Sequence, residues 1–431
     1  MLKLPLRSSV SVAVFLGIVI AAALMLGWHG ARYAVARQLI DADNLTHAVW
    51  AVRLDPQNAL VQNRAGFLYQ WKAANTSAAL PYLQRATELN SHGAAYWVDL
   101  AHGCELADQI ECAGSAYEKA VVLAPMRPGF IWELANYSLR VGDNEKALKG
   151  FAQYLRLLPS TRERTFRLVS RGIHDPALLW EKVVHVSGDP ETELAYLNFY
   201  KKQDAQAETA QLWSEVMEEG KLFPASAAVP YVDRLLEGLE YDQAKQAWTD
   251  MQAKGIVQAQ QPDDDLVYNG NFEEKPLNGG FDWRLHEQPY LYLDVAQPAS
   301  CRESRCLYVN FTVPQNLEYE PVYEIIPVKP HQLYSLSAYV RSQDITSDSG
   351  PRLRVVDPQC EACITAMTPS VIETRPWHKV EVTFMTGPRT QVLKLSVFRQ
   401  RSRVFPMEIS GEFWLDSVSL KLAGGAKTPA L

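Results

Sequence analysis

The stretch that decides the fold of the first half of this chain reads YWVDLAHGCELADQIECAGSAYEKAVVLAP at residues 96–125. It recurs in altered form as FIWELANYSLRVGDNEKALKGFAQYLRLLP at residues 130–159, a step of 34 residues. The shared columns hold a bulky apolar residue, leucine, alanine, alanine, an aromatic residue and proline: Trp97/Ile131, Leu100/Leu134, Ala101/Ala135, Ala113/Ala147, Tyr117/Phe151 and Pro125/Pro159. Such columns predict stacked helical hairpins, in which small residues allow close approach, aromatic residues fill the gaps and proline ends the second helix.

The period and the order of residue types resemble the tetratricopeptide repeat (TPR), whose helical hairpins stack into a curved α-solenoid. Two departures are Gly66, where leucine is usual, and Ser91, where proline is usual. After residue 160 the consensus fades but helical spacing continues in two pairs, 191–202 with 205–218 and 227–239 with 242–254. We therefore expect a TPR-like α-solenoid over residues 35–258.

A TPR-like solenoid implies a concave surface that binds a protein partner. On this alignment, the positions that face it include Arg64, Trp71, His102, Trp132 and Asn136. They mix aromatic and polar groups, without the run of Lys and Arg that would suit a peptide carboxylate. A second interpretation stays open, in which Trp71 and Trp132 simply pack between helices. We do not expect His102 to be a catalytic base, because no second titratable group shares its ridge.

The N-terminal segment has the length and composition of a membrane anchor. Residues 10–28 form a 19-residue stretch without a charged side chain, and a helix of that length spans roughly the ~30 Å hydrocarbon core of a bilayer. Lys3 and Arg7 precede it, so we expect residues 1–34 to be a cytoplasmic tip and a single inner-membrane helix, with the rest exported to the periplasm or beyond. The alternative is a cleaved signal peptide with its cleavage site at Ala34-Val35-Ala36, although the apolar stretch is long for one.

Composition and cysteine usage agree with export. The 431 residues are 47% hydrophobic and 21% charged with a formal net charge of −7, which argues against a disordered chain and against broad electrostatic binding of nucleic acid. The six cysteines lie in local pairs: Cys104/Cys112, Cys301/Cys306 and Cys360/Cys363. In an oxidising compartment such pairs form disulfides. A four-thiolate zinc site from the last two pairs, and a redox motif at residues 360–363, are the alternatives.

Beyond residue 258 the spacing of apolar residues changes from helical to strand-like. Residues 259–265 are the expected linker, residues 266–422 a second domain and residues 423–431 a flexible tail. In the middle of the domain, apolar and polar residues alternate, and one face of the strand holds Tyr334, Leu336, Ala338 and Val340. Short alternating strands separated by Pro, Gly and Asp predict an antiparallel β-sandwich, so the fold class is multidomain α plus β.

Three segments of this domain resemble the galactose-binding-like jelly rolls of the carbohydrate-binding-module type. Residues 266–273 are similar to their opening strand, residues 333–341 to a central strand and residues 411–420 to the closing strand. The resemblance implies a jelly roll; a sugar ligand does not follow from the fold alone. It also implies a structural calcium ion held by Glu273 and Asp416, with backbone carbonyls completing the shell. The alternative is that these two acids cap strand ends in solvent.

Aromatic residues with a neighbouring arginine supply the candidate glycan surface. Flat rings stack on the apolar faces of sugars, while arginine binds hydroxyl groups, and the candidates are Trp283, Tyr290, Tyr292, Tyr339 and Arg341. Packing beneath loops, or docking on the solenoid, would use such aromatics equally well. The basic run Arg399, Arg401 and Arg403 favours an anionic polymer, or is a solvated strand edge.

No catalytic motif stands out in the sequence, which holds no Gly-rich phosphate loop, His-Glu-x-x-His helix or Gly-x-Ser-x-Gly elbow. We expect a non-catalytic scaffold without a cofactor other than the calcium ion, in which the solenoid recruits a protein and the sandwich binds a glycan. The combination is similar to bacterial envelope proteins of exopolysaccharide or O-antigen assembly. The alternatives are a carbohydrate-active enzyme or its accessory subunit, and a purely structural interaction module.

Overall fold

The computed structural model describes residues 9–201, 206–258, 264–296, 301–302 and 304–423. The chain forms two compact units, residues 1–189 and residues 190–431. The first eight residues of the expected cytoplasmic tip, most of the expected linker and nearly all of the expected tail lie outside the described residues. The fold class is as expected: an apolar N-terminal helix, a helical region and two antiparallel sheets.

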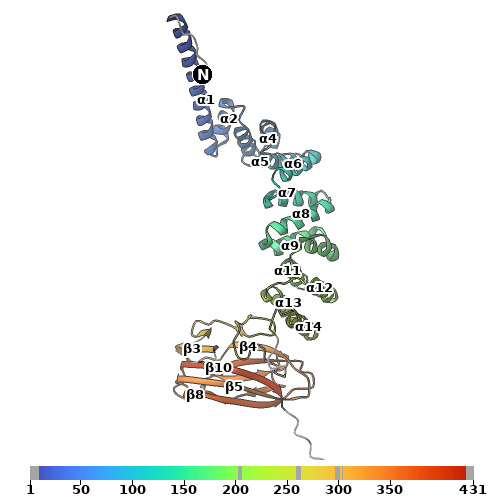
Figure 1. Cartoon of the computed structure of the whole chain (residues 1–431), viewed down its shortest axis with the longest axis vertical. Helices are drawn as coiled ribbons and strands as arrows, with labels where there is room; N and C mark the ends of the chain where they lie inside the picture. Colours follow the sequence, from blue (N-terminus) through green and yellow to red (C-terminus); the bar gives the residue numbers. More distant parts are fainter. Residues whose placement is uncertain (1–8, 202–205, 259–263, 297–300, 303, 424–431) are drawn as a thin grey trace, which may run out of the picture. The chain divides into compact units, whose positions relative to one another are not determined.

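The first unit is built from helices joined by short turns (Figure 1). They are α1 Ser9–Asp41, α2 Leu45–Leu54, α3 Ala59–Trp71, α4 Thr76–Leu89, α5 Ala94–Leu106, α6 Ile110–Leu123, α7 Pro128–Arg140, α8 Asn144–Leu157, α9 Arg162–Gly172 and α10 Pro176–Leu179. Short helical turns follow at Pro159–Thr161, Trp180–Val184 and His185–Ser187. Helices α4, α6 and α8 begin at residues 76, 110 and 144, so each starts 34 residues after the one before. The 34-residue repeat is therefore confirmed as pairs of helices.

Burial explains the repeated columns. The small residues are fully enclosed, and the bulky residue of the same column is Leu83, Tyr117 or Phe151 in successive units, each at most 1% exposed. Gly66 departs from the usual leucine because a Cβ atom there would lie 2.6 Å from Leu83, so α3 and α4 approach closely at this point. Local sequence also sets where helices begin. Asn44, Asn58, Asn75 and Asp143 each accept backbone N–H bonds as N-caps of α2, α3, α4 and α8.

Helix α1 carries the apolar segment. Its stretch from Val12 is long and apolar enough to cross a membrane, with a mean hydropathy of 2.2 in its most apolar window, and that window is 0% buried against the rest of the chain. Its C-terminal end packs where Ala36 and Ile40 meet α2 and α3. Length and exposure fit a membrane anchor or a signal sequence, because both need an apolar helix that no protein surface covers.

The second unit opens with four helices: α11 Pro190–Lys201, α12 Gln206–Glu218, α13 Ala225–Glu237 and α14 Tyr241–Ala253. The structure groups them with the sandwich and not with the earlier repeats. Trp248 of α14 packs edge-on against Tyr268 and Phe281, at centroid distances of 5.2 and 5.8 Å. Gly280 has φ +61, and a Cβ atom there would lie 2.2 Å from the Trp248 ring, so only glycine fits beneath the indole.

Two five-stranded antiparallel sheets form the sandwich, ordered β1-β4-β9-β6-β7 and β2-β3-β10-β5-β8. Figure 1 shows β10, β5 and β8 lying side by side in the second sheet. The strands are β1 Arg284–Leu285, β2 Tyr292–Ala296, β3 Cys306–Gln315, β4 Tyr319–Pro327, β5 Leu333–Ile345, β6 Arg352–Val356, β7 Thr365–Met367, β8 Glu373–Met385, β9 Val392–Arg399 and β10 Ile409–Leu422.

Register follows the period-two pattern. The four apolar residues predicted to share a face of β5 are each at most 1% exposed in the core, which confirms the alternation. The expected opening strand at residues 266–273 is not a strand. Asn269 and Phe272 have φ +51 and +53, values that a strand does not allow. A Cβ atom on Gly270 would lie 2.1 Å from the Val418 carbonyl oxygen, so the segment lies against β10 as a tight irregular turn.

All six cysteines form the expected local disulfides. Cα–Cα distances are 5.8 Å for Cys104–Cys112, 5.6 Å for Cys301–Cys306 and 5.3 Å for Cys360–Cys363. These fall within the range of ordinary disulfides. The Cys301–Cys306 and Cys360–Cys363 disulfides use the four thiolates that the zinc alternative required, and all three disulfides agree with an oxidising compartment.

Candidate functional site

The outer face of sheet β2-β3-β10-β5-β8 carries a row of aromatic side chains. Because apolar residues of each strand point into the core, their sequence neighbours point outward. Four neighbouring strands contribute one ring each, and we name this set the aromatic row: Tyr292, Tyr308, Trp414 and Tyr339. Tyr308 lies directly opposite Trp414 in the register, and Trp414 lies directly opposite Arg341.

Ring distances confirm that the row is continuous over its first three members. The centroids of Tyr292 and Tyr308 are 6.2 Å apart, and those of Tyr308 and Trp414 are 5.4 Å apart. Tyr292 is 52% exposed, whereas Tyr308 and Tyr339 are half-buried and Trp414 is only 4% exposed. A flat ligand lying along the row would therefore contact the exposed Tyr292 ring most fully, and Trp414 would lie deepest beneath it.

Charged groups cover part of the row. The Arg341 guanidinium lies 4.7 Å from the Trp414 ring centroid, and that of Arg302 lies 3.5 Å from the Tyr339 ring; both are cation–π contacts. The Tyr308 hydroxyl donates to Glu412 at 2.5 Å. Burial, followed by this hydrogen bond, raises the pKa of Tyr308 to about 12, so the phenol stays a proton donor at physiological pH.

The indole N–H of Trp414 is buried and has no acceptor among the described residues. A buried donor without an acceptor costs about 1–3 kcal/mol. A ligand hydroxyl reaching the floor of the row would satisfy it. The indole N–H groups of Trp248 and Trp283 are also buried without an acceptor among the described residues, so the Trp414 donor supports a polar ligand only together with the exposed Tyr292 ring and the two arginines.

Three of the five predicted glycan residues meet on this face: Tyr292, Tyr339 and Arg341. The prediction was wrong for Trp283, which is 0% exposed and packs against Phe272 at 5.1 Å within the core. Its neighbour Arg284 takes the outward position of the two-residue strand β1, so the alternation turns Trp283 inward. Tyr290 is also misplaced, because it packs half-buried against the core before β2 begins.

Sequence reasoning missed Tyr308 and Trp414, the two central members of the row. The signal was available for Trp414, because it stands between Phe413 and Leu415, which both face the core at 0% exposure. Alternation alone then places Trp414 outward. What the sequence does not contain is the strand order, which sets Tyr308 of β3 beside β10.

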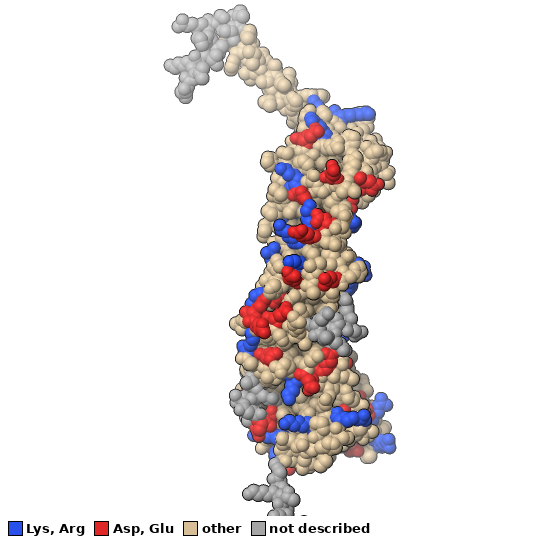
Figure 2. All heavy atoms as spheres, turned by 90° about the vertical axis from the view of Figure 1, so that its right-hand side faces the viewer, with Lys and Arg blue, Asp and Glu red and all other residues tan. Residues whose placement is uncertain are grey.

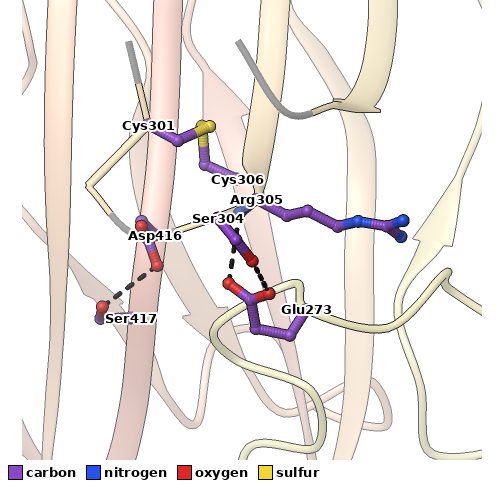
Figure 3. Close-up of a disulfide and its surroundings, with 7 residues drawn as sticks. All are labelled: Glu273, Cys301, Ser304, Arg305, Cys306, Asp416 and Ser417. Carbon is purple, nitrogen blue, oxygen red and sulfur yellow. Dashed lines mark hydrogen bonds between the residues drawn. A yellow bond between two sulfur atoms is a disulfide. The ribbon is translucent and has the colours of Figure 1, made fainter. Parts of the chain in front are cut away.

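The two acids expected to hold calcium both face the loop of the Cys301–Cys306 disulfide (Figure 3). Glu273 accepts from the Ser304 hydroxyl and from the Arg305 backbone N–H, the latter at 3.2 Å. Asp416 is 0% exposed and accepts from the Ser417 hydroxyl at 3.1 Å. Oxygen donors of this type suit Ca²⁺. The donors of residues 304–305 already engage Glu273, so a bound ion would compete with them.

On the opposite sheet, a cavity of about 440 Å³ opens between α13, the start of α14 and the outer face of β4. Tyr323 and His286 line it with their rings stacked 5.4 Å apart, and the Lys394 ammonium lies 4.6 Å from the Tyr323 ring centroid. The Tyr241 hydroxyl accepts from Gln359 at 3.1 Å on the rim. Volume and mixed lining fall in the range of small-ligand sites.

Beside that cavity, Glu320 lies in a cluster of cations. It accepts from Arg354 at 2.8 Å and from the Lys394 ammonium and Ser396 hydroxyl. Burial acts to raise the pKa of Glu320, but the three hydrogen bonds outweigh it and the pKa is lowered. Glu320 is thus an ionised structural anion and not a group that donates a proton.

In the repeat region, two of the predicted protein-binding residues form one surface. Trp71 of α3 is 54% exposed and contacts the His102 ring of α5 edge-on at 6.0 Å. His102 Nε2 lies 3.3 Å from Glu133 of α7. We expected no second titratable group on the ridge of His102, and this was wrong. Helices α5 and α7 are the first helices of successive repeats, and Glu133 of α7 faces His102 of α5.

The other three predicted residues are engaged within the repeats. Arg64 pairs with Asp43 at 2.8 Å, Asn136 donates to the Trp132 carbonyl at 2.8 Å, and Trp132 packs on Tyr154 at 4.8 Å. Trp132 therefore fits the packing interpretation, whereas Trp71 keeps an exposed ring.

Asp99 of α5 makes the folding stability of the first unit depend on pH. Burial raises its pKa to about 6, against the opposing effects of His102 and of the 2.5 Å hydrogen bond from Asn63. The folded pKa exceeds the unfolded one, so folding stability should fall as pH rises from about 4 to 6. We expect Asp99→Asn to remove this slope and to stabilise the first unit by about 1–3 kcal/mol at pH 8, measured by urea unfolding. The exposed Asp108→Asn is the control; an unchanged slope in Asp99→Asn would contradict the assignment.

The basic run of the sandwich separates into two kinds of residue. Arg399 is 0% exposed, while Arg401 and Arg403 are exposed. Acidic and basic side chains are interspersed over most of the face that Figure 2 shows, in keeping with the modest net charge. The solvated-edge interpretation is therefore wrong for Arg399, whose position at the end of β9 turns it inward.

Comparisons with known proteins assign no family. No family model and no curated protein matches the chain. A crystal structure of MamA protein is 16% identical, covers 42% of this chain and 96% of its own, and has a TM-score of 0.32. The structure titled "CBM4 structure and function" is 13% identical, covering 36% of this chain and 99% of its own at a TM-score of 0.27.

A third similar structure is the enzymatically active domain of bacteriophage CBA120 tailspike protein 4, at 12% identity and a TM-score of 0.28. The match covers 37% of this chain and 21% of that chain, so the chain spans about a fifth of the tailspike structure. Each of these is a partial structural similarity, and none transfers an activity.

Proposed function

We propose that this protein is a membrane-anchored, exported scaffold without catalytic activity, whose helical repeats bind a protein partner and whose sandwich binds a glycan along the aromatic row. The supporting observation is the row itself, with its arginines and the unsatisfied indole N–H of Trp414. Flat rings that stack on sugars, together with donors at the floor, are the pattern by which proteins hold carbohydrate.

The arginines indicate what kind of glycan would bind. Arg341 and Arg302 lie over Trp414 and Tyr339, so acidic sugars would gain charge-assisted hydrogen bonds that neutral ones lack. We therefore propose an acidic envelope polysaccharide as the ligand, with Glu273 and Asp416 holding a structural Ca²⁺ beside the row, where Asp416 lies directly opposite Tyr339 in the register. The solenoid would present Trp71, His102 and Glu133 to the protein partner.

The test is a glycan array with the full chain in nanodiscs, with and without a chelator. We expect binding to acidic polysaccharides, and about a tenfold loss of affinity in Tyr292→Ala and in Tyr308→Ala. Tyr323→Ala, on the opposite sheet, is the matched control. If Tyr323→Ala alone lost binding, the glycan site would be the cavity beside α13; if no glycan bound, the glycan assignment would fail. If a chelator changed neither the affinity for glycan nor the melting temperature, the proposed calcium site would be contradicted.

A carbohydrate-active enzyme is the competing function. Glycoside hydrolysis needs two carboxyl groups across a cleft, one of them a proton donor. In the pair Glu318 and Glu320, the lowered pKa of Glu320 and its three donors argue against that role. Any turnover of a bound polysaccharide by purified protein would overturn the scaffold.

Placement in the inner membrane with an exported bulk is part of the same proposal. It draws on the uncovered apolar helix α1 and the three disulfides. A C-terminal reporter that is active only outside the cytoplasm tests this orientation.

A further inference from the structure

The loop between β9 and β10 ends in an exposed apolar tip. Val404, Phe405 and Met407 are 59%, 90% and 44% exposed, and we call these three residues the apolar tip. Polar residues usually occupy loop ends, because apolar side chains there gain nothing from the folded chain. A clustered exposed apolar set of this kind indicates something that covers it.

The tip is held in place by hydrogen bonds on both sides. Arg399 donates to the Met407 carbonyl at 2.9 Å, and the Ser402 hydroxyl accepts from the Val404 backbone N–H at 3.0 Å. Ser402 is itself fixed through Asn316, by bonds of 2.9 and 3.0 Å in both directions. The loop therefore cannot fold its apolar residues back without losing buried bonds, and the exposure is built into the structure.

Two cations precede the tip in the chain, and the exposed Glu408 follows it directly. Arg401 and Arg403 are exposed, and neither forms an ion pair within the part of the chain that the structure describes. An apolar point with unpaired arginines beside it matches the interface of an anionic bilayer, where the rings and aliphatic groups enter the acyl boundary and the guanidinium groups meet phosphate.

The small size of the tip favours a lipid surface over a protein. A stable protein interface needs about 800 Å² from each partner, whereas one aromatic side chain supplies at most about 250 Å². A protruding point of three apolar residues fits the depth of a lipid interface better than the breadth of a protein one.

The tip also lies away from the helices of its unit. Strand β9 begins at Val392, which lines the cavity against α13, and ends at Arg399, next to the loop. The tip is thus at the end of the strand opposite to the cavity. We propose that the apolar tip inserts into the surface of an anionic bilayer, with Arg401 and Arg403 binding lipid phosphates. This proposal does not depend on glycan binding.

The test uses the full chain reconstituted in phosphatidylglycerol-rich vesicles. The chain has no free cysteine, so Val404→Cys accepts a single environment-sensitive fluorophore. Met385→Cys is the matched control, because Met385 is 62% exposed and pairs with Leu333 at the other end of the sandwich. All variants share the same N-terminal helix, so any difference reports the position of the label.

We expect lipid-attached quenchers to quench the label at residue 404 and not at residue 385. Adding Phe405→Ser should lower the inserted fraction about tenfold, with the melting temperature unchanged since Phe405 is 90% exposed. Vesicles of phosphatidylcholine alone, or Arg401→Gln with Arg403→Gln, should also weaken quenching. Equal quenching at both positions, none at residue 404, or no effect of Phe405→Ser would overturn the proposal. If the label at residue 404 responded to an envelope protein but not to lipid, the tip would bind a protein and the bilayer proposal would be wrong.

Discussion

Replacing Arg399 by methionine is expected to destabilise the sandwich by about 3–5 kcal/mol, because four buried or partly buried acceptors would lose their donor. The guanidinium donates to the carbonyls of Ser349, Leu317 and Met407 and to the Ser347 hydroxyl. Methionine fills much of the volume but donates nothing, so the loss measures the hydrogen bonds and not the space. Denaturant unfolding followed by calorimetry gives the change.

The control for Arg399 lies two residues away. Arg401 is exposed and has the same chemistry, so Arg401→Met should change stability by no more than about 0.5 kcal/mol. Equal effects of the two substitutions would mean that Arg399 is not the donor that holds this end of the sandwich.

The second large effect is expected at Trp283. Trp283→Ala should cost about 3–5 kcal/mol, because it removes a fully buried indole next to Phe272 and leaves a cavity. Trp283→Phe should cost less, since the indole N–H has no acceptor among the described residues and no hydrogen bond is lost with it. Thermal unfolding of both variants separates the destabilisation caused by the cavity from that caused by losing the indole N–H.

Glycan binding by the folded Trp283 variants distinguishes the core from the site. We expect Trp283→Ala to bind with unchanged affinity wherever it is folded, and Tyr292→Ala to lose affinity at unchanged stability. The reverse pattern would return Trp283 to the binding surface, and a fully stable Trp283→Ala would show that the indole is not in the core.

Periodicity in the sequence was enough to predict the repeats and most strands. A 34-residue step can be read directly, because every hairpin must present the same small and aromatic residues to its neighbours. Likewise, alternation located β5, the resemblance to jelly rolls located β10, and local spacing gave the three disulfides. The opening segment failed because strand-like composition at residues 266–273 conceals two residues with positive φ.

The binding face was harder to predict because it depends on strand order. Tyr308 and Trp414 are over a hundred positions apart in the chain, yet they lie opposite each other in the register. No local pattern encodes that neighbourhood. Trp283 failed for a related reason: a strand of two residues is too short to show which of its sides faces the core.

The contact at Gly280 also determines which fragment of the chain can be transferred to another protein without losing its packing. Trp248 rests directly on this glycine, and Asp233 accepts a hydrogen bond from its N–H at 2.8 Å. A fragment that begins within residues 259–265 would lack Trp248, and the Tyr268 and Phe281 rings that pack against this indole would be exposed to solvent. A fragment that begins at Pro190 keeps α14, and with it Trp248, together with the sandwich. Recombination, in nature or in the laboratory, should therefore transplant this sandwich together with its four preceding helices.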